Sequence, residues 1–141
     1  MSDCIFCKFV NKEITPIIVY EDDLCLVLMD KFPLTRGQTL IIGKTHVDYV
    51  FDLEDEIYSH CMLIAKRIAK ATDSALSSER CWMIIQGLEV AHNHIKILPL
   101  YAGKHIPIEE GTGKEMPDDE LLEIAHLIQT ALKNNTKIRT V

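Results

Sequence analysis

The chain has 141 residues, of which 48% are hydrophobic and 26% are charged, and its formal net charge is −6. This length and apolar content suffice for one domain with a buried core, while the negative charge argues against binding to nucleic acid polymers. No apolar stretch approaches the length of a membrane span, and the N-terminus lacks the long apolar run of a signal peptide. We therefore expect a soluble cytoplasmic protein with no membrane partner.

The first part of the chain predicts three strands. Residues 17–21 (IIVYE) and 24–29 (LCLVLM) flank an acidic turn at Asp22 and Asp23, which is typical of a β-hairpin. A loop punctuated by Pro33 and Gly37 leads to the third strand, residues 38–44 (QTLIIGK), which Gly43 ends.

Two helices and two strands are predicted after residue 50. Asp52, with Asp55 three positions later, resembles a capping box for a helix that runs to about Ala75. Its apolar stripe at helical spacing consists of Ile57, Cys61, Ile64, Ala65, Ile68 and Ala71. Residues 80–86 and 90–98 predict the fourth and fifth strands.

The C-terminal part is predicted to be an irregular segment followed by a helix. Residues 100–117 contain two prolines and three glycines, and Asp118 or Asp119 then caps a helix over about residues 119–134. Its stripe consists of Leu121, Ile124, Leu127, Ile128 and Leu132. The order of elements predicts a single α+β domain over residues 1–141, with its core at about 4–99. We expect a mostly antiparallel five-stranded sheet, one long helix packed on it and a C-terminal helix.

The five cysteines fall into two groups. Cys25, Cys61 and Cys81 lie singly in apolar segments and are expected to be small buried side chains. Cys4 and Cys7 form Cys-x-x-Cys, a common first half of a zinc site. Histidines or cysteines elsewhere in the chain must complete such a site, and His46 and His92 are the candidates. Spacing alone leaves a pair without metal equally open, whereas a redox pair is disfavoured because no βαβ unit surrounds it.

Residues 89–99 (EVAHNHIKILP) carry a second chemical signal. In a strand, His92, His94 and Lys96 would share one face because they stand at alternate positions. A neutral imidazole held by a hydrogen bond at one nitrogen is a competent nucleophile toward phosphorus at the other. His94 is thus a candidate nucleophile, and the alternative is a hydrogen-bonded strand histidine without a catalytic role.

These motifs together resemble the histidine triad (HIT) superfamily. Residues 30–46 (DKFPLTRGQTLIIGKTH) and 87–99 (GLEVAHNHIKILP) resemble two of its motifs, the second being His-φ-His-φ-His-φ-φ with φ apolar. Residues 4–8 (CIFCK) resemble the start of its zinc-carrying bacterial members. The resemblance covers about residues 4–99 and implies a HIT-like fold.

The resemblance also implies roles for individual residues. A structural zinc ion would be held by Cys4, Cys7, His46 and His92. His94 would be the nucleophile that forms a covalent nucleotidyl-histidine, and Asp30 would bind the ribose hydroxyls. The candidates for a base pocket, which would equally suit a plain core, are Ile5, Phe6, Phe9 and Leu28. A homodimer through the long helix and the sheet edge is expected as well.

Several positions depart from the family pattern. Lys96 replaces the third histidine, which in most family hydrolases contacts the phosphate and the leaving group. Glu89 stands where many members have a Ser or Thr that binds the phosphate or the leaving group. Asn93 occupies a normally apolar position, Gln38 replaces a histidine, and Gly43 replaces a common proline. Lys96 could bind phosphate, could pair with Glu89, or could be a solvated side chain on a degenerate site.

Two functional hypotheses follow. The first is a nucleotide hydrolase or nucleotidyltransferase that acts on a nucleoside phosphoramidate, a dinucleotide or a related nucleotidyl ester. The second is a non-catalytic protein that binds a nucleoside monophosphate and carries a structural zinc site. A zinc-stabilised scaffold without a nucleotide ligand is a third and simpler interpretation.

Overall fold

The computed structural model describes residues 3–106, 109 and 111–138. Its elements in chain order are α1 (Ile5–Val10), β1 (Ile18–Glu21), β2 (Cys25–Met29), β3 (Thr39–Gly43), the 3-10 turn η1 (Val50–Asp52), α2 (Asp55–Leu76), β4 (Arg80–Ile84), β5 (His94–Leu100) and α3 (Asp118–Ile138). The predicted α+β class, with five strands, a long helix and a C-terminal helix, is confirmed.

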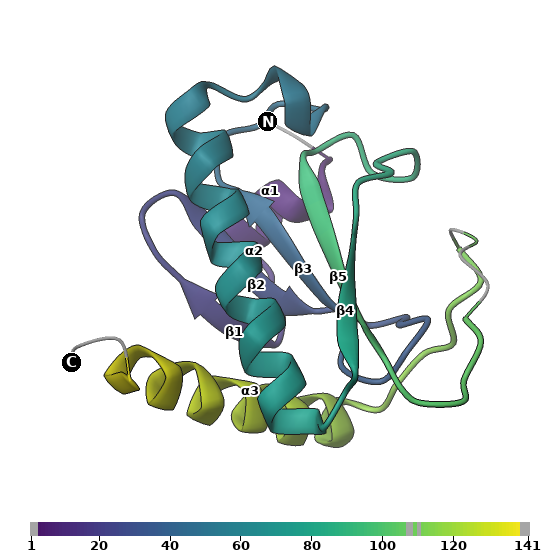
Figure 1. The fold of residues 1–141 in the computed structure, drawn as a ribbon. Helices are drawn as coiled ribbons and strands as arrows, with labels where there is room; N and C mark the ends of the chain where they lie inside the picture. Colours follow the sequence, from purple (N-terminus) through teal and green to yellow (C-terminus); the bar gives the residue numbers. More distant parts are fainter. Residues whose placement is uncertain (1–2, 107–108, 110, 139–141) are drawn as a thin grey trace.

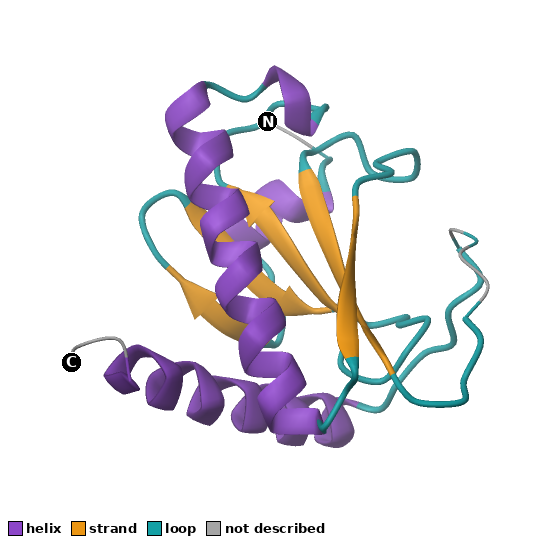
Figure 2. Cartoon of the chain, in the orientation of Figure 1, coloured by secondary structure: helices purple, strands orange, loops and turns teal. Residues whose placement is uncertain are grey.

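The strands, which are labelled in Figure 1, form one antiparallel sheet (Figure 2). Their order in the sheet is β1-β2-β3-β5-β4, with β1 and β4 at its edges. The register between β3 and β5 places Ile42 opposite His94 and Leu40 opposite Lys96. Because side chains alternate between the faces of a strand, His94 and Lys96 share a face with Leu40 and Ile42.

Each face of the sheet has its own apolar core. The long helix α2 lies across one face, where it packs on β3 and β5 through residues such as Ile41 and Ile95 (Figure 1). The short helix α1 lies on the opposite face, where Phe6 packs with Leu28 and Ile42. The histidine of β5 is therefore on the α1 face of the sheet.

Helix α3 extends the first core. It packs against α2 and β1, and Gln129 Nε2 donates to the carbonyl of Ile18 at 3.1 Å. The predicted stripe is buried at Leu121, Ile124 and Ile128. The prediction that Leu127 belongs to this buried stripe is wrong, because Leu127 is 38% exposed.

The structure differs from the sequence-based expectation of local structure in three places. Helix α1 was not predicted, because six residues are too few to show an apolar period. Helix α2 begins at Asp55 rather than Asp52, since η1 occupies the preceding turn and buries Val50. The fourth strand ends at Ile84 and the fifth begins at His94, so His92 lies before the strand rather than in it.

The predicted stripe of α2 is confirmed at Cys61, Ile64, Ala65, Ile68 and Ala71, all of which are buried. Within the described residues, none of the helices combines the length and the apolar character that crossing a lipid bilayer requires.

Candidate functional site

The first turn of α1 brings Cys4 and Cys7 to the same side of the chain. Cys4 is the N-cap residue, and its Sγ accepts a hydrogen bond from the backbone N–H of Cys7 at 3.5 Å. Residues three apart on a helix are neighbours on its surface, so both thiols face one point.

His46 and His92 complete the group at that point. The Nδ1 atom of His92 lies 3.5 Å from the Sγ atoms of Cys4 and Cys7, and 3.1 Å from Nδ1 of His46. The Sγ atom of Cys7 is also 3.1 Å from His46 Nδ1. One ligand atom from each of the four residues lies within 4.8 Å of the others, so the group could hold a metal ion.

The orientation of His92 is determined by a backbone carbonyl. The Nε2 atom of His92 lies 2.7 Å from the carbonyl oxygen of Gly43. A carbonyl oxygen can only accept a hydrogen bond, so Nε2 carries the proton. The other nitrogen, Nδ1, is then a lone-pair donor directed at the thiols. Burial lowers the pKa of His92, and the nearby His46 and His94 act in the same direction, which favours this neutral form.

Asn93 joins the two halves of the site. Its side-chain oxygen accepts from the N–H of Gly43 at 3.0 Å, and its Nδ2 donates to the carbonyls of Thr45 at 2.8 Å and Val47 at 3.0 Å. The chain around His46 is thereby fastened to the turn that precedes β5. The sequence contained a signal for this role, because a polar residue stands at a normally apolar position.

His94 is the first residue of β5 and is 4% exposed. Its Nδ1 lies 2.7 Å from the carbonyl oxygen of His92, so Nδ1 must carry the proton and Nε2 holds the lone pair in the neutral ring. The edge of Phe6 contacts the ring at a centroid distance of 5.0 Å. The imidazole is thus held in one orientation and one tautomer.

A cavity of about 210 Å³ opens beside His94. Its wall comes from the segment before η1 and from the loop after β4, and includes Tyr49, Ile85, Gln86 and Leu88. The sequence did not indicate these residues, because their positions depend on how the two loops meet.

Lys96 lies two residues further along the same face. Its side chain is buried, with 9% exposure, so the interpretation as a solvated lysine is wrong. The Nζ atom donates to Oε1 of Gln86 at 3.3 Å. Because Gln86 lines the cavity beside His94, the ammonium group lies close to that cavity.

Asp30 follows β2 at the other end of the strand face. Its carboxylate accepts from Gln38 Nε2 at 2.7 Å and from the N–H of Phe32 at 2.9 Å, while Gln38 Oε1 accepts from the N–H of Leu34 at 2.8 Å. Gln38 is 2% exposed and organises this loop, a role that sequence reasoning missed. In the sheet, Asp30 lies four positions along the chain of β2 from the residue that is level with His94. This offset is on the order of 13 Å along the strand direction.

The remaining predicted residues divide between cavity and core. Ile5 and Glu89 line a cavity of about 470 Å³ that also borders Cys4 and His46. Phe6 and Leu28 are 6% and 3% exposed and belong to the core beneath α1, against which Phe9 packs. Of the candidates for a base pocket, Ile5 alone lies on the wall of this cavity.

Comparison with known proteins gives a consistent result. Residues 11–103 match the family model described as HIT domain. An uncharacterized HIT-like protein from Borreliella burgdorferi is 32% identical over 132 residues, which cover 89% of this chain and 95% of that protein. Adenylylsulfatase HINT3 from Arabidopsis thaliana is 30% identical over 70% of this chain and 52% of its own length.

Among solved structures, a zinc-bound histidine triad family protein from Mycobacterium smegmatis superposes with a TM-score of 0.85. The two chains are 27% identical, and the match covers 96% of this chain and 97% of the other.

Proposed function

Because this chain belongs to the HIT domain family and has its fold, we propose that it is a nucleotide hydrolase or nucleotidyltransferase that acts through His94. Its substrate is a nucleoside phosphoramidate, a dinucleotide or a related nucleotidyl ester. The observation that supports this most strongly is the hydrogen bond from His94 Nδ1 to the His92 carbonyl. The similarity to a relative named as an adenylylsulfatase supports a nucleotidyl substrate.

The proposed reaction has two displacements. The Nε2 atom of His94 attacks the α-phosphorus, a P–N bond forms, and the leaving group departs with the electron pair of its bond and takes up a proton. Water or another acceptor then attacks the phosphorus, and His94 leaves. A histidine restrained to one tautomer loses little freedom in reaching this geometry.

Lys96 and Asp30 have supporting roles in this proposal. Lys96 supplies a positive charge beside the cavity, which stabilises the negative charge on the phosphoryl oxygens. Asp30 binds the ribose. A carboxylate has about four lone-pair sites, so the two hydrogen bonds from Gln38 and Phe32 still leave it able to accept from hydroxyls.

We propose that the metal ion is zinc, bound by Cys4, Cys7, His46 and His92. In a tetrahedral zinc site, donor atoms stand roughly 3.3 to 3.8 Å apart, as follows from its bond lengths. The observed separations of 3.1 to 3.5 Å fit this set of two sulfurs and two nitrogens. Four protein ligands leave no open position, so zinc supplies structure here: it ties α1 to the turn that orients His94.

A covalent adduct tests the catalytic proposal. The protein is incubated with adenosine 5′-phosphoramidate, and the intact mass and the products are followed by mass spectrometry. We expect a nucleotidyl adduct or product with the unmodified chain and with His126→Ala, an exposed histidine on α3, but neither with His94→Ala. Lys96→His shows the role of the lysine, because gained hydrolysis would mean that Lys96 changed the chemistry.

The same experiment distinguishes the second hypothesis, a non-catalytic nucleotide-binding protein. It is favoured by Glu89, whose carboxylate is exposed on the wall of the cavity beside the metal ligands, where it would repel a phosphate. If the unmodified chain binds nucleoside monophosphates yet forms no adduct or product with any nucleotidyl ester tried, the enzyme proposal fails.

We further propose that residues 1–141 form a single cytoplasmic domain that acts as a homodimer. The two cores share one sheet, which supports a single domain. Thiol ligands such as Cys4 and Cys7 remain reduced in the cytoplasm, which supports the location. Strand β4 lies at an edge of the sheet, and Met83 on β4 and Leu63 on α2 are 41% and 57% exposed, which supports a dimer surface there.

A further inference from the structure

A second cavity lies where the chain leaves β5, beside the loop that joins β2 to β3. Its volume is about 320 Å³, and its lining includes the basic side chains Arg36, Lys104 and His105, the hydroxyl side chains Thr35 and Tyr101, and two aliphatic residues. None of the described residues that line it carries a carboxylate. In a chain with a net charge of −6, this cavity is a local concentration of positive charge.

The loop that carries Arg36 is fastened to the segment after β5. Thr35 Oγ1 donates to the carbonyl of Pro99 at 2.9 Å, and the Tyr101 hydroxyl donates to the carbonyl of Arg36 at 2.6 Å. Gly37 has φ +96°, and a Cβ there would collide with the side chain of Leu76. The backbone at Arg36 is therefore held in place before any ligand arrives.

Tyr101 also organises the second basic residue. The N–H of Lys104 donates to the Tyr101 carbonyl at 3.1 Å, and its Nζ lies 5.9 Å from the centre of the Tyr101 ring. Burial raises the pKa of Tyr101, while the nearby Arg36 guanidinium acts in the opposite direction. The Tyr101 ring thus lies close to the Lys104 ammonium group, while its hydroxyl is bonded to the backbone of Arg36.

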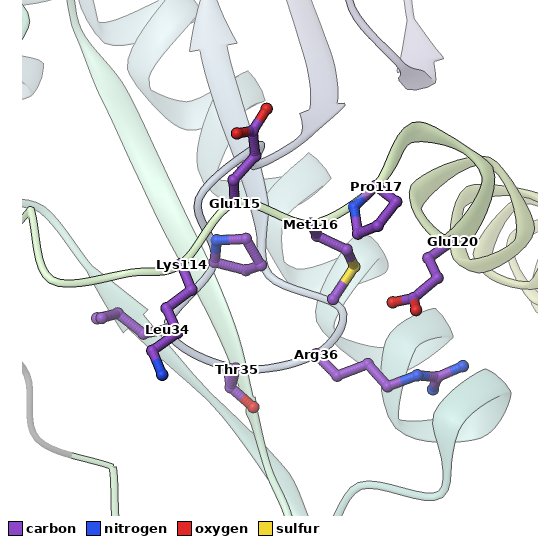
Figure 3. A pocket seen from close by; sticks show the side chains of 9 residues that line it. Leu34, Thr35, Arg36, Lys114, Glu115, Met116, Pro117 and Glu120 are labelled. Atoms are coloured by element: carbon purple, nitrogen blue, oxygen red, sulfur yellow. The ribbon is translucent and has the colours of Figure 1, made fainter.

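Arg36 has a carboxylate nearby but, among the residues that the structure describes, forms no ion pair with one. On the other side of the loop lies a cavity of about 230 Å³, where the Arg36 side chain extends on the same side as Glu120 (Figure 3). The ion pairs among the described residues do not include Arg36. The guanidinium therefore keeps its capacity to bind an anion.

We propose that the basic cavity binds a phosphate group, either as inorganic phosphate or as a small phosphate monoester. A guanidinium can grip two phosphate oxygens at once, and an ammonium adds a point charge. The volume lies at the lower end of the range for small-molecule sites, roughly 300 to 1,000 Å³. The site is distinct from that of His94, because six steps along β5 separate the two by on the order of 20 Å.

Nuclear magnetic resonance of the full chain tests this proposal. Inorganic phosphate and ribose 5-phosphate are titrated separately into His94→Ala protein, which limits competition at the other site, against sodium chloride at equal ionic strength. We expect saturable shifts of the backbone amides of residues 34–36 and 101–106. Replacing Arg36 and Lys104 together by Gln should raise Kd at least tenfold, because two charge-assisted contacts are lost.

The matched control is Lys66→Gln with Lys70→Gln, two exposed lysines of α2 whose loss changes the net charge equally. Its Kd should stay within about twofold of the parent value, so that a general charge effect is separated from a site. Shifts confined to other regions, or an unchanged Kd in the Arg36 and Lys104 variant, would overturn the proposal. If that variant does not fold, Lys104→Gln alone must still weaken binding, since Lys104 is exposed.

Tighter binding of the monoester than of the inorganic ion identifies an organic phosphate as the ligand, and equal binding identifies phosphate itself.

Discussion

At the scale of single residues, two departures from the family pattern explain each other. The amide oxygen of Asn93 accepts from the N–H of Gly43, a bond that a proline at position 43 could not make because it has no N–H. A Cβ at residue 43 would also collide with that amide oxygen. Asn93 therefore requires glycine at its partner position, and each substitution makes sense only with the other.

Gly43→Ala should lower the free energy of unfolding by about 1 to 3 kcal/mol, because the displaced Asn93 leaves buried polar groups unsatisfied. Urea unfolding followed by circular dichroism measures this change. The control is the same substitution in Asn93→Ala protein, where the collision is absent and the loss should be smaller. Strictly additive losses from the two substitutions would show that the residues are not coupled in this way.

The hydrogen-bonded carboxylate of Asp22 should make the free energy of unfolding depend on pH. Its carboxylate accepts from the backbone N–H groups of Leu24 and Cys25, each at 2.9 Å, and from the Tyr20 hydroxyl at 2.7 Å, and lies 2.6 Å from His60 Nε2. Burial acts to raise the pKa of Asp22, but these hydrogen bonds together outweigh it and lower that pKa below its ordinary value. The stabilisation is therefore present above the unfolded-state pKa and is lost as pH falls through the folded-state pKa.

Asp22→Asn should accordingly reduce the free energy of unfolding at neutral pH by on the order of 2 kcal/mol. It should also flatten the loss of stability in acid below about pH 5. Chemical denaturation at a series of pH values measures both effects. Asp23→Asn, which removes the same charge from the exposed neighbour, should behave like the unmodified chain, and an equal effect of the two would rule out the hydrogen-bonded carboxylate as the cause.

At the scale of elements, α1 illustrates a structure that depends on the rest of the molecule. Six residues are too few for a stable isolated helix, and this one is held by Phe6 in the core and by Cys4 and Cys7, which belong to the group of side chains that could hold a metal ion. Its packing beneath the sheet supports His94 through the contact with Phe6.

Removal of the proposed zinc ion should therefore destabilise the folded chain through the loss of its hold on α1. A chelator should lower the Tm of the zinc-loaded chain by several degrees, because a ligand bound only to the folded state stabilises it. Differential scanning calorimetry with and without chelator measures this. Cys4→Ser should abolish the response, whereas Cys81→Ser, a half-buried cysteine away from the site, should keep it. The same Tm with and without chelator would disprove a structural zinc site.

At the scale of the whole molecule, β4 is an edge strand, and no other strand of the described residues pairs with its outer side. Exposed edge strands are usually covered in native proteins because their backbone groups can pair with another chain. Met83 on β4 and Leu63 on α2 are large, exposed apolar side chains, and both elements pack on one another. This edge is the surface at which we expect a second copy of the chain.

Light scattering coupled to size-exclusion chromatography should thus give the mass of a dimer for the unmodified chain. Leu63→Asp with Met83→Asp should shift the protein to monomer, because the charges would be buried at the interface. The control is Leu122→Asp, which places a charge on an equally exposed residue of α3. A monomer in the unmodified chain, or an undisturbed dimer in the double variant, would exclude this interface.

The sequence by itself determined the elements with strong periodicity. The stripes of α2 and α3 were predictable because each repeats at the spacing of a helix, and β2 and β3 because short apolar runs bounded by turn residues are typical of buried strands. The motifs also indicated which side chains gather, since Cys4, Cys7, His46 and His92 do meet in space.

Only the tertiary structure decided the boundaries of β5, the tautomer of His94 and the burial of Lys96. The sequence predicts strands over residues 80–86 and 90–98, but the bonds of Asn93 to Gly43, Thr45 and Val47 hold the chain in a turn until His94. A hydrogen bond to a backbone carbonyl or a neighbour such as Gln86 depends on contacts between distant segments, which no local pattern of residues records.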